Sequence, residues 1–242
     1  TWSALLLWGT PAYKLNVFSA FLMVFAALGL RGALRAWGVP SLPSASVAAL
    51  ATFSRPSWTA ATVSEPYALM AALAAWSLRE AATRRPAVAW LFAGLAICAH
   101  PLAVVLVPIL LLVCKNGKWQ ALTPLVLLIG LAPLLALPIR AKADPALNWG
   151  RTETLTGFVQ HLTRAEYRGL LLTETRPAPP REGGWGVLRR FAREFSADLT
   201  PPVAAAAVAG LALAVRWFPR PGWGLALGFL LAGPGYALAA SL

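Results

Sequence analysis

The stretch PAVAWLFAGLAICAHPLAVVLVPILLLVC, residues 86–114, decides the fold of this chain. Its 29 residues carry no formal charge, and a straight helix of that length would measure about 44 Å. One upright crossing of a bilayer takes about 20 residues, so the stretch is too long for one crossing and too short for two. Pro101, near its centre, disfavours a helix that continues through it. We therefore expect a re-entrant hairpin of two short helices that meet at His100.

The composition around this stretch is typical of a membrane protein. Of the 242 residues, 58% are hydrophobic and 12% are charged, and the mean hydropathy is +0.64. A soluble domain carries about 25% charged residues. The formal net charge is +12, but the basic residues lie in short links between apolar runs, whereas a nucleic-acid-binding protein gathers them on one solvated face. We expect an all-α, polytopic transmembrane bundle whose partner is the lipid bilayer and not nucleic acid.

The apolar runs divide the chain into three parts. Residues 1–139 form a transmembrane helical region, in which residues 15–34 and 119–139 are each long enough to cross a bilayer as one helix. Residues 140–200 form a polar extracytoplasmic segment whose periodicity predicts amphipathic helices lying along the membrane surface. Residues 201–242 hold two C-terminal spans.

Clusters of arginine and lysine predict which helix ends share a side of the membrane, because short cytoplasmic loops are rich in these residues. The four clusters are Arg31/Arg35, Arg79/Arg84/Arg85, Lys115/Lys118 and Arg216/Arg220. They share one side only if residues 44–62 and 64–81 form a hairpin and residues 86–114 turn back. Glu65, His100 and residues 140–200 then lie together on the outer side. If residues 86–114 are instead one tilted span, the polar segment lies in the cytoplasm.

Glu65 and His100 are the candidate catalytic residues. A carboxylate near the end of a membrane helix is costly unless it is solvated or paired, and Arg55 is placed to pair with Glu65. The alternative is a Glu-Pro helix start, where the helix dipole favours an acid. His100 is a candidate base, and its alternative is a capped turn before Pro101.

The polar segment supplies candidate binding residues. Arg140 and Lys142 place two cations at the outer interface, where they can clamp a lipid phosphate or anchor to headgroups. The sequences NWG (148–150) and HLTRAEY (161–167) combine flat aromatic faces with hydrogen-bonding groups, as a sugar-binding surface does, although interfacial belts use the same aromatics. The candidates are Arg140, Asn148, Trp149, His161, Arg164 and Tyr167.

Metal and cofactor chemistry is not predicted. The two cysteines lie within apolar sequence, and with only two histidines no zinc-binding spacing exists. The chain also lacks the motifs of nucleotide-binding loops, serine hydrolases and zinc proteases. We expect no metal and no cofactor.

Five sequence blocks, in order, resemble a family of bacterial polytopic membrane proteins related to transmembrane protein O-mannosyltransferases, within the GT-C glycosyltransferase superfamily. The blocks are KLNVFSAFLMVFAALGL (14–30), SRPSWTAATVSEPYALMAAL (54–73), AGLAICAHPLAVVLVP (93–108), LPIRAKADPALNWG (137–150) and FVQHLTRAEYRG (158–169). The family's motif positions fall on Trp58, Ala61, Glu65, Tyr67, Gly94, His100, Arg140, Asn148, Trp149, Gly150, His161, Arg164 and Tyr167.

The resemblance implies a GT-C-like fold in the bacterial inner membrane. It also implies transfer of a mannose-type sugar from a polyprenyl-phosphate donor to a protein or glycan acceptor on the outer face. Glu65 and His100 would then serve the acceptor hydroxyl, and Arg140 and Arg164 the phosphate. The family's acidic motif precedes the first block, whereas residues 1–13 contain no acid, so we expect this chain to lack the catalytic loop.

Two other functions fit the sequence. A transporter or flippase of lipid-linked substrates would use broken helices, but the paired repeats typical of transporters are not found. A non-catalytic membrane scaffold would explain the missing acidic motif.

Overall fold

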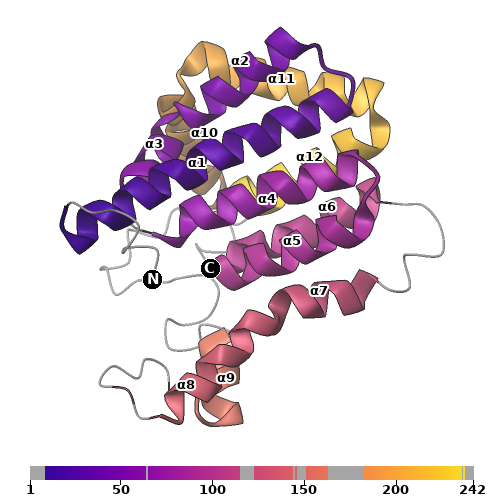
Figure 1. Ribbon diagram of the computed structural model, residues 1–242. Coiled ribbons are helices and arrows are strands. Elements are labelled where there is room, and N and C mark those ends of the chain that lie inside the picture. The colour runs from indigo at the N-terminus through magenta and orange to yellow at the C-terminus, as the bar shows by residue number, and fades with distance from the viewer. Residues whose placement is uncertain are drawn as a thin grey trace.

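The computed structural model describes residues 9–63, 65–114, 123–143, 145, 151–162, 183–235 and 237. Over these ranges the chain is all-α and contains no strand (Figure 1). The elements in chain order are α1 (Pro11–Ala36), α2 (Ser41–Thr52), α3 (Arg55–Thr62), α4 (Pro66–Ala82), α5 (Pro86–Ala99), η2 (Pro101–Val105), α6 (Leu106–Val113), α7 (Thr123–Leu131), η4 (Ala132–Leu135), α8 (Ala136–Ala141), α9 (Leu155–Leu162), α10 (Gly184–Leu199), α11 (Pro201–Trp217), α12 (Pro219–Leu230) and η6 (Leu231–Gly235).

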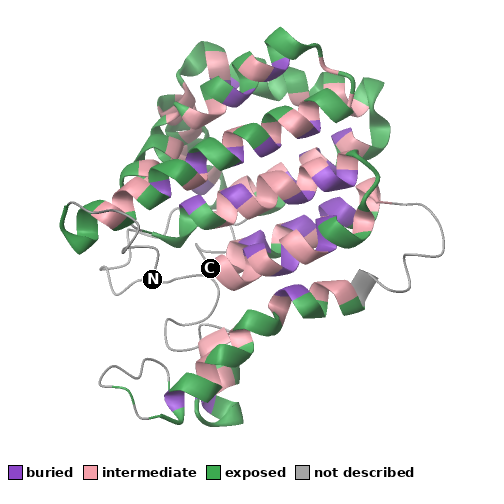
Figure 2. Ribbon diagram, in the orientation of Figure 1, coloured by how far each residue is buried: buried purple, intermediate pink, exposed green. Residues whose placement is uncertain are grey.

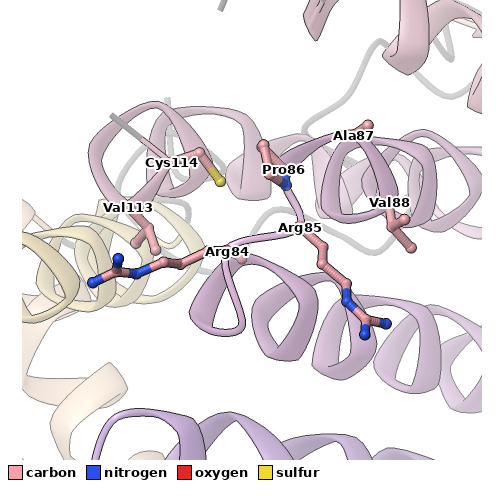
Figure 3. Close-up of a pocket in the computed structure, with 8 residues that line it drawn as sticks. Arg84, Arg85, Pro86, Ala87, Val88, Val113 and Cys114 are labelled. Carbon is pink, nitrogen blue, oxygen red and sulfur yellow. The ribbon is translucent and has the colours of Figure 1, made fainter. Parts of the chain in front are cut away.

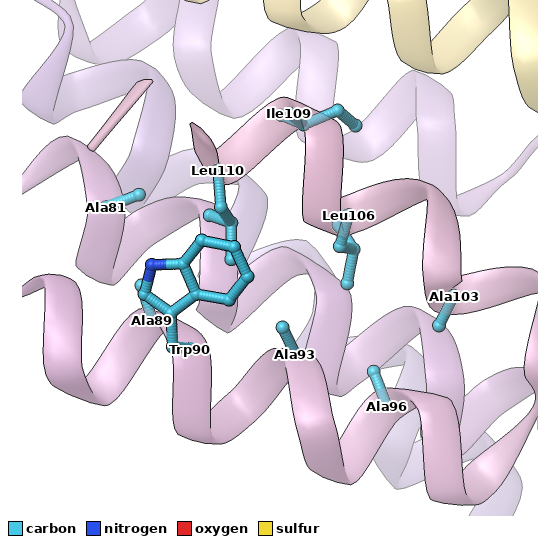
Figure 4. Packing of buried hydrophobic residues seen from close by; sticks show 9 residues of the cluster. All are labelled: Ala81, Ala89, Trp90, Ala93, Ala96, Ala103, Leu106, Ile109 and Leu110. Carbon is cyan, nitrogen blue, oxygen red and sulfur yellow. The ribbon is translucent and has the colours of Figure 1, made fainter. Parts of the chain in front are cut away.

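The chain turns back at His100, as the sequence predicts. Helix α5 ends at Ala99, and His100 has extended backbone angles, φ −156° and ψ 130°, before the short 3₁₀ helix η2. The start of α5 and the residue after α6 then meet, because Pro86 and Cys114 line the same pocket. Trp90 near the start of α5 and Leu110 near the end of α6 belong to one buried cluster (Figure 4).

Helix α1 lies between α2 and α4 (Figure 1). It begins after Thr10, whose side-chain oxygen accepts a hydrogen bond from the backbone N–H of Tyr13 at 3.3 Å. The indole Nε1 of Trp76 in α4 donates to the carbonyl oxygen of Phe25 in α1 at 2.9 Å, and the two rings stack with centroids 4.6 Å apart. This interface fixes α1 and α4 side by side.

The expected hairpin of residues 44–62 and 64–81 differs from the structure in one respect. Its first arm comprises α2 and α3 and its second arm is α4, and in Figure 1 α2 and α4 lie on opposite sides of α1. The chain reaches α4 through the short helix α3 and the extended residue Val63, with φ −116° and ψ 137°. The clusters of arginine and lysine predict which ends of helices lie together, but they do not specify which helices are neighbours.

The described arginine clusters gather at one end of the bundle. Helices α1 and α4 run parallel, because Gly29 of α1 faces Trp76 and Gly32 faces Arg79. Helix α12 packs antiparallel to α6, with Gly224 beside Val113. The arginine end is defined here by Arg31, Arg35, Arg79, Arg84, Arg85, Arg216 and Arg220. Lys115 and Lys118 lie outside the described residues.

Helix length separates α1 from the rest. With 26 residues and a mean hydropathy of 1.9 over its best window, α1 is the one described helix that is long and apolar enough to cross a membrane alone. Helices α10 and α11 pass the same test only as a pair, and they are bent by 108° at Thr200. The expected span at residues 119–139 is helical from Thr123 onward, but a 3₁₀ turn that contains Pro133 interrupts it.

Helices α5 and α7 meet backbone to backbone at two glycines. A Cβ atom at Gly94 would lie 2.6 Å from the carbonyl oxygen of Leu127, and one at Gly130 would lie 2.6 Å from that of Leu91. The thiol of Cys98 donates to the carbonyl oxygen of Gly130 at 3.3 Å across the same contact. Small residues that allow such approach are typical of helix packing in membranes.

Substitution of Gly94 by valine is expected to lower the free energy of unfolding by about 1–3 kcal/mol, because the backbone of α7 cannot move aside without losing its packing. Unfolding in detergent by titration with SDS measures the change. Gly210→Ala is the control, since no atom lies within 4 Å of a Cβ there. We expect that control to be neutral or stabilising by about 0.5–1 kcal/mol. Equal stability of Gly94→Val and the parent would contradict the close contact.

Candidate functional site

The chain between α2 and α4 places Glu65 at the end of the bundle opposite the arginines. The hydroxyl of Ser54 donates to the carbonyl oxygen of Ala51 at 2.7 Å, and α3 starts at the next residue. Glu65 occupies the N-cap position of α4, but its side chain makes no capping hydrogen bond. The residue is exposed, so its carboxylate is accessible to a ligand.

A cleft of about 620 Å³ lies between α3, the start of α4 and the end of α10. We call it the acidic cleft, and its lining residues are Arg55, Pro56, Thr59, Ala60, Glu65, Tyr67, Glu194, Ala197 and Asp198. The two acids of α10 are four residues apart, so they occupy the same face of that helix. The cleft therefore brings residues from distant parts of the sequence together.

The acidic cleft combines three carboxylates with one guanidinium. Arg55 and Glu65 line it together, as the sequence suggested, but no ion pair within 4 Å joins these two described residues. Nor does any cluster of three metal-ligating side chains occur in the part of the chain that the structure describes. Carboxylates that face solvent beside a partly exposed tyrosine ring suit a ligand with many hydroxyl groups, since they accept its hydrogen bonds.

His100 packs against Tyr67, one of the residues that line the acidic cleft. Its ring lies 4.8 Å from the ring of Tyr67, centroid to centroid, and the residue is only 8% exposed. The Nδ1 atom accepts a hydrogen bond from the backbone N–H of Leu102 at 3.2 Å, which caps η2. These contacts are those of a capped turn that positions Tyr67.

The other predicted site residues are not brought into the acidic cleft. Arg140 on α8 is exposed and His161 on α9 is half-buried, and Figure 1 shows both helices apart from α3 and α10. Neither residue lines the cleft. The remaining four predicted residues lie outside the described residues: Asn148, Trp149, Arg164 and Tyr167.

Sequence reasoning missed Glu194 and Asp198. It placed the apolar face of their helix on the membrane surface, whereas Phe191 and Phe195 pack against Phe229 of α12, with ring centroids 6.2 and 5.5 Å apart. Docking of this aromatic face turns the acids of α10 toward α3. The amphipathic pattern could have indicated a polar face, but not what that face meets.

No protein family, curated protein or solved structure matches this chain.

Replacement of His100 by alanine is expected to lower the free energy of unfolding by about 1 kcal/mol, because the N–H of Leu102 loses its acceptor. His100→Asn keeps a side-chain acceptor near that position and should retain most of the stability. Thermal unfolding in detergent compares the two variants. Equal loss in both would show that the hydrogen bond to Nδ1 does not stabilise the turn.

Proposed function

We propose that this chain is a polytopic, GT-C-like glycosyltransferase component that handles a polyprenyl-phosphate-linked, mannose-type sugar. The sugar would be donated at the outer face of a bacterial inner membrane to a protein or glycan acceptor. The observation that carries the proposal is the acidic cleft, which joins Glu65 and Tyr67 to the acids of α10 at the end away from the arginines.

A membrane location is supported by the apolar side chains on the outside of the bundle. Phe21 and Leu28 of α1 are 64% and 53% exposed, and Leu128 and Ile129 of α7 are 59% and 63% exposed. Figure 2 shows exposed positions along both of these helices. A soluble monomer rarely exposes contiguous apolar patches larger than a few hundred Å². A bilayer would cover this surface.

The sidedness of the cleft follows from the arginine end. Positively charged loops remain on the cytoplasmic side of a membrane, so the arginine end would face the cytoplasm. The acidic cleft, at the other end, would face outward. Short helices such as α5 and α6 fit this arrangement as a re-entrant pair that returns to the side on which it starts.

The cleft offers groups for each part of a sugar transfer. A new bond would form between C1 of the sugar and the acceptor oxygen, as the bond from C1 to the phosphate oxygen breaks. Glu65 would accept the proton of the acceptor hydroxyl, and polyprenyl phosphate would leave. Arg55, which lines the cleft, would bind that phosphate, and the ring of Tyr67 would pack against a sugar ring. The resemblance of the Glu65 and His100 blocks to O-mannosyltransferases supports the same chemistry.

Glu65→Gln is expected to lower sugar transfer at least 10-fold, because general-base catalysis contributes about 10²–10⁴-fold to a rate. Transfer of labelled mannose from polyprenyl phosphate is measured in membranes that contain the natively expressed protein. Glu153→Gln, outside the cleft, is the matched control and should keep the parental rate. Full transfer by Glu65→Gln would refute the assigned role, and lipid-linked sugar crossing vesicles without transfer would favour a flippase.

The proposed orientation of the two ends of the bundle can be tested by cysteine labelling in a chain whose Cys98 and Cys114 are replaced by alanine. A single cysteine at Thr59, on the rim of the cleft, should react with a membrane-impermeant maleimide in intact spheroplasts. A single cysteine at Arg220 should react only after permeabilisation. Labelling of both positions from the same side would contradict the proposed orientation.

A further inference from the structure

A second pocket lies at the arginine end, where the turn from α4 to α5 meets the end of α6 (Figure 3). Its volume is about 390 Å³. Arg84 and Arg85 contribute its charged lining, and Pro86, Val88, Val113 and Cys114 supply most of the rest. We call it the arginine pocket. It thus combines a cationic edge with an apolar wall, a combination that matches an amphiphilic anion.

No carboxylate among the lining residues neutralises the two arginines of the arginine pocket. Glu80 is buried beside it, with Oε1 2.7 Å from Nη1 of Arg79 and Oε2 3.7 Å from Nη1 of Arg85. This single carboxylate is therefore shared by two arginines and does not line the pocket. The guanidinium of Arg84 makes no hydrogen bond or ion pair with any described residue, and in Figure 3 this side chain extends away from that of Arg85.

The first turn of α5 adds to the positive potential. The helix starts with Pro86, has no side-chain cap, and places Ala87 and Val88 in the lining. The N–H groups of a first helical turn lack partners within the helix, and the dipole makes that end attractive to anions. Pro86 has no N–H of its own, so Ala87 and Val88 are the first-turn donors nearest to the pocket.

Arg84 has a backbone conformation that is unfavourable for arginine. Its φ of +62° lies in the left-handed region, which favours glycine and disfavours a residue with a Cβ atom. This conformation belongs to the turn that ends α4, where the backbone N–H of Arg84 donates to the carbonyl oxygen of Ala81 at 3.2 Å. An unpartnered guanidinium at the mouth of an apolar pocket points to an anionic ligand from outside the chain.

We propose that the arginine pocket binds the phosphate of an anionic phospholipid from the cytoplasmic leaflet, with its acyl chains along Val88 and Val113. This inference rests on the proposed membrane location, but not on sugar transfer. A phospholipid fits better than a soluble anion because the wall of the pocket is mostly apolar, and because Leu111 on α6 is 59% exposed on the outside of the bundle.

Arg84→Gly tests the proposal, because it removes the guanidinium and also suits the backbone. The full chain is purified in detergent with equal amounts of phosphatidylglycerol and phosphatidylcholine, and bound lipid is counted by native mass spectrometry. We expect the parent to retain mainly phosphatidylglycerol and the variant to retain at least fivefold less. The melting temperature of the variant should stay the same or rise, as the left-handed residue becomes glycine.

Arg220→Gln is the matched control, because Arg220 is an exposed arginine at the same end and does not line the pocket. Its bound phosphatidylglycerol should stay within twofold of the parent. Equal retention by Arg84→Gly would overturn the proposal, and so would equal loss in Arg220→Gln, which would indicate bulk charge and no defined site. Arg84→Gln serves as a second variant and should lose the lipid as Arg84→Gly does. A failure of sugar transfer would leave these lipid counts unchanged, so the two proposals can fail separately.

Discussion

The His100–Pro101 peptide is the constraint on which the rest of the structure depends. Proline has no N–H to donate and its ring opposes a helix that continues through it, and the longest uncharged stretch of the chain does not form one straight helix. Because the chain reverses there, α6 returns along α5 and gives α12 a surface to pack against. The same reversal brings the turn before α5 next to the end of α6. The two pockets, one at each end of the bundle, both depend on it.

The interior of this bundle contains mainly small side chains, and many of its large apolar side chains are exposed. Alanine dominates the buried residues, and Gly94 allows α5 to touch the backbone of α7. Leu128 and Ile129, by contrast, lie on the outside of α7. Small residues let neighbouring helices approach closely, so van der Waals contact between their backbones contributes to the packing. Close packing of small residues therefore contributes to the stability of this bundle, and the two pockets with charged linings lie at its opposite ends.

Sequence reasoning succeeded where the cause was local and failed where it was not. The break at His100 follows from the proline after it. The reversals expected from the basic clusters agree with the gathering of Arg35, Arg79 and Arg216 at one end of the bundle. Neither argument says which helices become neighbours, so the position of α1 between α2 and α4 was not predicted. The acids of α10 were missed for a similar reason, since only the packing of Phe195 on Phe229 turns them toward α3.

The ring contact between Tyr67 and His100 has a consequence for genetics. Tyr67, which lines the acidic cleft, packs against His100, the residue at which the chain reverses. A substitution of His100 would therefore disturb the cleft even without contact between His100 and a ligand. In a mutant library, defects at these two positions would therefore produce the same phenotype. Protein abundance would separate them, because a weakened reversal exposes the chain to quality-control proteases, whereas a damaged cleft leaves its steady-state level intact.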